Sequence, residues 1–141
     1  MFLFAIAAAT LTASCYSSDY NRTVTANVAL LSDMSDKLLD YCRRDFRLDG
    51  RPISSEEMGE FYYSFNKASA FSSSTPREVS RESHRDLIKM LNAYERFVHA
   101  ADAYRLGGKQ DPAMLASLTS QHDQVRLLAG KVIEDLRNEK R

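Results

Sequence analysis

Residues 75–106 read TPREVSRESHRDLIKMLNAYERFVHAADAYRL, and their pattern is the clearest indication of the fold class. Its core-type positions alternate in spacings of four and three, and they are Ser83, Leu87, Met90, Tyr94, Phe97, Ala101 and Tyr104. Because an α-helix has about 3.6 residues per turn, this spacing places them on one face. Thr75, Pro76 and Glu78 form a helix-start signal, and Gly107-Gly108 is a stop signal. The sequence therefore predicts a long amphipathic helix over 75–106.

Three further segments repeat this pattern. A first helix is predicted over 23–48, where Asp49-Gly50-Arg51-Pro52 stops it. A short second helix begins at the capping box of Ser54 and Glu57 and ends in a polar turn. A fourth begins at Asp111-Pro112, and its stripe is Leu115, Leu118, His122, Val125, Ala129, Val132 and Leu136.

Short connections between these segments favour antiparallel neighbours. We therefore predict an all-α fold over residues 23–141, namely an up-down-up-down antiparallel four-helix bundle with a short second helix. The chain has only 5 Gly and 3 Pro, and it has no segments of alternating β-branched residues, which disfavours an all-β fold.

The N-terminal sequence predicts the cellular location of the protein. Residues 1–14 are apolar and uncharged, and the apolar run is shorter than the roughly 20 residues that a membrane-spanning helix needs. Leu11-Thr12-Ala13-Ser14-Cys15 resembles a bacterial lipobox, in which the cysteine is diacylated and becomes the first mature residue. We predict a lipoprotein signal peptide over 1–14 and a polar tether over 15–22. The alternative is an ordinary buried N-terminal helix.

Whether the two cysteines can pair depends on this lipidation prediction. Lipidation of Cys15 would leave Cys42 without a partner, whereas an unmodified Cys15 would allow a Cys15–Cys42 disulfide. Cys42 lies on the apolar stripe of the first helix, so we expect it to be buried. The expected location is the periplasm-facing surface of a membrane, to which the lipid anchors the protein. Tyr16 after the cysteine favours the outer membrane.

Composition disfavours several classes of function. The 19 basic and 19 acidic residues are interspersed, and no basic patch contains aromatic residues, so nucleic-acid binding is not expected. The sequence lacks paired Glu-x-x-His motifs for di-iron, a haem-attachment motif, a zinc cluster and a glycine-rich phosphate loop. We expect no cofactor and no enzymatic activity, although a hydrolase whose residues meet only in space stays open.

Histidines are the weak candidates for chemistry. His122 falls on the core stripe of the fourth helix, and we expect it to be buried with a hydrogen bond from a nearby Tyr or Ser. Glu95, His99 and Asp102 stand at positions i, i+4 and i+7, which makes them weak metal candidates on one helix face. A solvated charged face is the simpler interpretation of these three residues.

Tyr62 and Tyr63 are candidates for a partner-binding surface. Adjacent helical residues point about 100° apart, so one narrow stripe cannot bury both rings. Tyrosine is common in binding hot spots. We therefore expect an envelope protein that binds an unidentified envelope partner as a scaffold or inhibitor-like accessory protein. The alternative is a small-molecule or haem-binding bundle, with His122 or Met90 facing a cavity.

Overall fold

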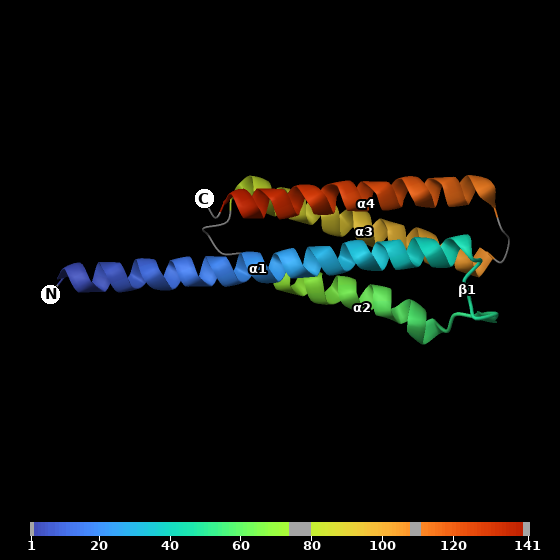
Figure 1. The fold of residues 1–141 in the computed structure, drawn as a ribbon, viewed down its shortest axis with the longest axis horizontal. Coiled ribbons are helices and arrows are strands. Elements are labelled where there is room, and N and C mark those ends of the chain that lie inside the picture. The colour runs from blue at the N-terminus through green and yellow to red at the C-terminus, as the bar shows by residue number, and fades with distance from the viewer. Residues whose placement is uncertain (1, 74–79, 108–110, 140–141) are drawn as a thin grey trace.

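A computed structural model describes residues 2–73, 80–107 and 111–139, with side chains from Asp19 onward. Its elements are α1 (Phe2–Arg43), β1 (Arg47–Leu48), β2 (Arg51–Pro52), α2 (Ser55–Ser72), α3 (Arg81–Gly107) and α4 (Pro112–Asn138). In Figure 1, α1 and α3 run in one direction, and α2 and α4 run in the other. The predicted all-α bundle is confirmed, and α2, with 18 residues, is its shortest helix in the described residues.

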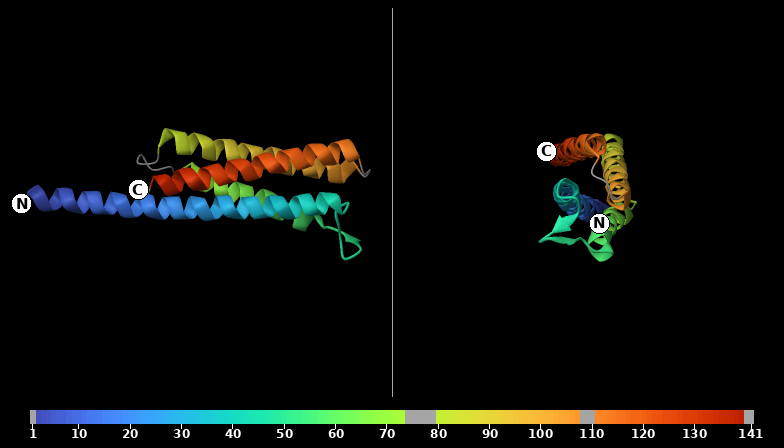
Figure 2. Two further views of the ribbon diagram at one scale, coloured as in Figure 1. Left: turned by 45° about the horizontal axis from the view of Figure 1, so that its top comes forward. Right: turned by 90° about the vertical axis from the view of Figure 1, so that its right-hand side faces the viewer.

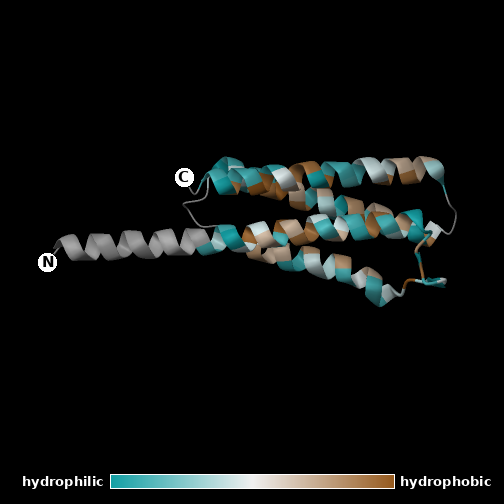
Figure 3. Cartoon of the chain, in the orientation of Figure 1, coloured by the Kyte–Doolittle hydropathy of each residue, from teal (hydrophilic) through white to brown (hydrophobic). Residues whose placement is uncertain are grey.

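The four helices enclose one apolar core. Both α2 and α4 pack against α1 and α3, and the end-on view in Figure 2 shows the four helices around a common axis. Apolar positions gather on the sides of the helices that face one another (Figure 3). The largest fully buried side chains come from all four helices and include Leu31, Phe61, Tyr94, Phe97 and Val125. Burial of the predicted stripes is therefore the main stabilising contribution.

The first helix differs from its predicted bounds. It begins at Phe2 rather than Thr23, and it ends at Arg43 rather than Leu48. Tyr20 and Asn21 are buried, and the Tyr20 ring stacks on Phe71 of α2 with centroids 5.4 Å apart. The described part of the predicted tether, residues 19–22, is therefore folded into the bundle, which corrects the prediction. Tyr20 precedes Val24 by four residues, so it extends the apolar stripe by one turn.

The signal peptide over 1–14 and the lipidation of Cys15 stay predictions. The side chains of residues 1–18, which include Cys15, lie outside the described part of the chain. No described helix is long and apolar enough to cross a membrane.

A two-stranded hairpin replaces the predicted end of the first helix. Asp49 and Gly50 have φ values of 50° and 78°, and β1 pairs antiparallel with β2 on either side of them. Two consecutive positive φ values are typical of a type I′ turn, which Asp-Gly favours. Asp49-Gly50 was predicted to act only as a helix stop, although the same dipeptide is also a hairpin signal. Phe46, just before β1, is buried and ties the hairpin to the core.

The helix starts follow the predicted capping residues where the structure describes them. At α2, the Glu57 amide donates to Ser54 Oγ at 3.1 Å, and the Ser54 amide donates to Glu57 Oε2 at 2.6 Å. A hydrogen bond and charge from Arg51, with the Ser54 amide, lower the pKa of Glu57 to about 2. Asp111 caps α4 as predicted. The predicted start of the third helix at Thr75 lies outside the described residues, and α3 begins at Arg81.

Candidate functional site

The two adjacent tyrosines of α2 have different environments. Tyr63 is 68% exposed, whereas Tyr62 is half-buried against α3. The structure thus confirms that one stripe does not bury both rings. On the helix surface, positions three and four residues from Tyr63 are its neighbours. Those positions are occupied by Gly59, Glu60, Asn66 and Lys67. We call Tyr63 and these four residues the α2 outer face.

Tyr62 joins α2 to α3. Its hydroxyl donates to Asp102 Oδ2 at 3.2 Å and lies 3.5 Å from His99 Nδ1, and its ring meets the His99 ring edge-on. Arg105 holds the same carboxylate, with Nη2 2.8 Å from Asp102 Oδ1. Burial raises the pKa of Tyr62, and the negative charge of Asp102 raises it further. Tyr62 therefore remains a protonated hydrogen-bond donor at neutral pH and stabilises the helix contact.

The weak metal candidates lie beside this contact. His99 Nε2 is 3.9 Å from Glu95 Oε1; His99 is exposed, whereas Glu95 is half-buried. The Asp102 carboxylate already accepts hydrogen bonds from Tyr62 and Arg105. Over residues 19–73, 80–107 and 111–139, no three His, Cys, Asp or Glu side chains are grouped so that they could hold a metal ion.

His122 is buried, as predicted, but its partners are carboxylates rather than Tyr or Ser. Its Nε2 lies 2.6 Å from Asp36 Oδ1 of α1, and its Nδ1 lies 3.3 Å from Asp123 Oδ1. Arg126 Nη1 donates to the other Asp36 oxygen at 2.7 Å. Burial alone would raise the pKa of Asp36, but the hydrogen bonds from His122 and Arg126 outweigh it and hold the pKa below 3.8. This cluster fastens α4 to α1.

Cys42 is 1% exposed and free, which confirms its predicted place in the core. Burial raises the pKa of its thiol to about 12. Since the thiolate is the reactive form of cysteine, Cys42 is a poor nucleophile near neutral pH.

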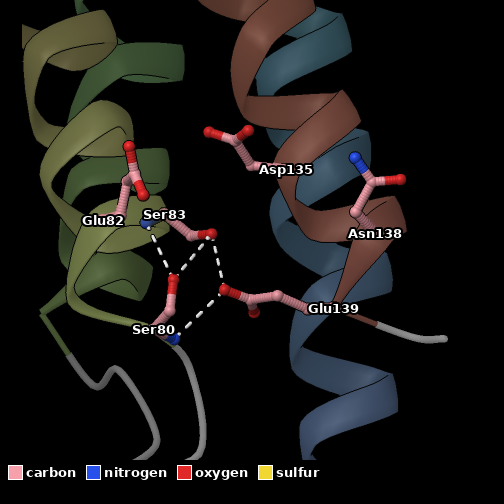
Figure 4. Close-up of a pocket in the computed structure, with 6 residues that line it drawn as sticks. All are labelled: Ser80, Glu82, Ser83, Asp135, Asn138 and Glu139. Carbon is pink, nitrogen blue, oxygen red and sulfur yellow. Dashed lines mark hydrogen bonds between the residues drawn. The ribbon is translucent and has the colours of Figure 1, made fainter.

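A polar hollow of about 290 Å³ lies where the start of α3 meets the end of α4. Figure 4 shows Glu139, the C-cap residue just after α4, reaching towards Ser80 and Ser83. Glu139 Oε1 accepts from the Ser80 amide at 3.1 Å and from Ser83 Oγ at 2.5 Å. Burial raises the pKa of Asp135, which lies across the hollow. No local sequence pattern indicates this hollow, because its two sides lie more than 50 residues apart in the chain.

Comparison of the chain with protein-family models, with curated proteins and with solved structures finds no match.

Proposed function

We propose that this chain is an exported, lipid-anchored helical bundle that binds another macromolecule of the cell envelope. It acts as a scaffold or an inhibitor-like accessory protein, and it has no catalytic role. The N-terminal sequence supports the location, because residues 1–14 have the length and composition of a signal peptide, and Cys15 follows small residues.

The α2 outer face supports the binding role, and the exposure of Tyr63 is the observation that carries it. A 68% exposed tyrosine contributes little to the core, yet its broad amphipathic ring suits an interface. Gly59 adds backbone surface next to the ring, since a side chain there would meet no atom within 4 Å. Glu60 and Lys67 supply the charged rim that is typical around a hot spot.

The cofactor-binding alternative receives less support. An imidazole that binds haem iron needs a free ring nitrogen. Both ring nitrogens of His122 already face carboxylate oxygens. The centroids of the His122 and Phe97 rings are 6.0 Å apart. Met90 is fully buried in the core.

Site-specific photocross-linking tests the binding role. A photoreactive phenylalanine analogue replaces Tyr63 in one variant and Leu127 in the other, because Leu127 is 75% exposed on α4. Irradiation of intact envelopes should give a discrete adduct from position 63 and none from position 127. Tyr63→Ala should then weaken capture of the partner so identified by about 5- to 30-fold, which corresponds to a hot spot of about 1–2 kcal/mol. Identical adducts from both positions, or none from position 63, would place the interface elsewhere.

The N-terminus of the native protein tests the location. We expect intact mass spectrometry to show a chain that begins at Cys15 and carries acyl groups, because signal peptidase would remove residues 1–14. Cys15→Ala should release the protein from the membrane fraction. A native chain that retains Met1, or an unmodified Cys15 thiol, would refute the anchor.

A further inference from the structure

A second surface feature lies between α3 and α4, away from the α2 outer face. It is a groove of about 170 Å³, lined by Lys89, Asn92 and Arg96 of α3 and by Gln124 and Leu128 of α4. These spacings of three and four residues keep each set on one helix face. Four of the five side chains end in N–H donors, and no carboxylate lines the groove. Leu128 is half-buried and supplies an apolar surface.

The basic side chains at and beside this groove differ in their acidic partners. Asp86, one turn before Lys89, is 1% exposed and meets two ammonium groups: Lys89 Nζ at 3.2 Å and Lys131 Nζ at 2.7 Å. The contact with Lys131, and then that with Lys89, lowers the pKa of Asp86, so it carries one full negative charge at neutral pH. Lys131 lies outside the groove and has further acidic neighbours, because Asp86 first, and then the charges of Asp135 and Glu82, raise its pKa. Arg96, which lines the groove, forms no ion pair with the described residues.

We propose that this groove binds a phosphate group. A guanidinium presents a planar fork of donors that matches two phosphate oxygens, and an ammonium and two carboxamides can reach the remaining oxygen positions. A bound phosphate supplies the negative partner that Arg96 lacks among the described residues, and Leu128 can contact an apolar part of the same ligand. The site lies on α3 and α4 and does not depend on the function proposed for α2.

Binding is measured by NMR with inorganic phosphate as the probe, at constant ionic strength adjusted with chloride. The side-chain amides of Asn92 and Gln124 should shift and saturate, and Arg96→Ala should raise the dissociation constant about tenfold through the loss of its charge-assisted bonds. Arg96→Lys keeps the positive charge but lacks the planar fork of donors. Its dissociation constant should lie between those of the natural chain and of Arg96→Ala. Arg137→Ala is the matched control, because it removes an equal charge from an exposed position of α4 about 20 Å along the helix from Gln124.

A second measurement distinguishes a soluble ligand from a lipid headgroup. Vesicles of phosphatidylcholine, with and without phosphatidylglycerol, are sedimented with the full chain carrying Cys15→Ala, which removes the predicted acylation site. Arg96-dependent sedimentation with phosphatidylglycerol would place the phosphate on a lipid, whereas phosphate binding without sedimentation would assign a soluble ligand. The site would be overturned if Arg96→Ala and Arg137→Ala lost phosphate affinity equally. It would also be overturned if phosphate did not shift the side-chain amide signals of Asn92 and Gln124. Circular dichroism of each variant checks that the fold is retained.

Discussion

Replacing Phe61 with alanine is expected to lower the free energy of unfolding by about 3–5 kcal/mol. Phe61 has no exposed surface, and its ring meets the edge of Tyr41 of α1 with centroids 6.0 Å apart. The Tyr94 hydroxyl of α3 donates to the Phe61 carbonyl at 3.3 Å. Truncation would leave a cavity where α2 meets both neighbouring helices, because packed helices relax only partly around a lost ring.

Tyr63→Ala is the matched control for this prediction. It removes a similar ring two residues further along the same helix, but from an exposed position. We expect its effect on the free energy of unfolding to be within about 0.5 kcal/mol. Urea unfolding of both variants, followed by circular dichroism, measures the difference. Similar losses in the two variants would contradict the assignment of Phe61 to the core and of Tyr63 to the surface.

Alkaline pH should destabilise the protein through Cys42. Burial raises the pKa of its thiol from 9.0 to about 12 in the folded chain. The contribution to stability is complete below pH 9.0 and is lost as the pH rises towards 12, because the unfolded chain releases this proton first. Between about pH 8 and about pH 10.5, titration of this single thiol should lower the free energy of unfolding by about 2 kcal/mol.

The variant Cys42→Ala isolates this contribution from other alkaline titrations. Its free energy of unfolding should fall by about 2 kcal/mol less than that of the natural chain over the same pH interval. Urea unfolding at several pH values measures both slopes. Parallel slopes would show that Cys42 is accessible to solvent. Ionisation of Tyr94 should also destabilise the fold, at higher pH, because burial raises the pKa of its phenol.

Several features of the fold were predictable from local sequence. Ser54 and Glu57 form their capping box within one helical turn, and Asp111 caps α4 in the same way. The stripe positions Cys42 and His122 are buried because helical periodicity alone places them beside Leu, Val and Ala. Tyr20 could have been assigned to the first helix by the same rule, but the polar residues around it favoured a tether. Asp49-Gly50 shows a different limit, since the dipeptide signals both a helix stop and a hairpin turn.

Local sequence predicted the helical class, the capped starts of α2 and α4 and the stripe residues of the core, because these depend on interactions over three or four positions. Which polar side chains meet depends instead on how the helices pack together. Tyr62 and Asp102 are 40 residues apart, and Asp36 and His122 are 86 residues apart. The groove of Lys89, Arg96 and Gln124 likewise needs two helices in one register. That register results from the simultaneous packing of all four stripes, which no single segment of sequence specifies.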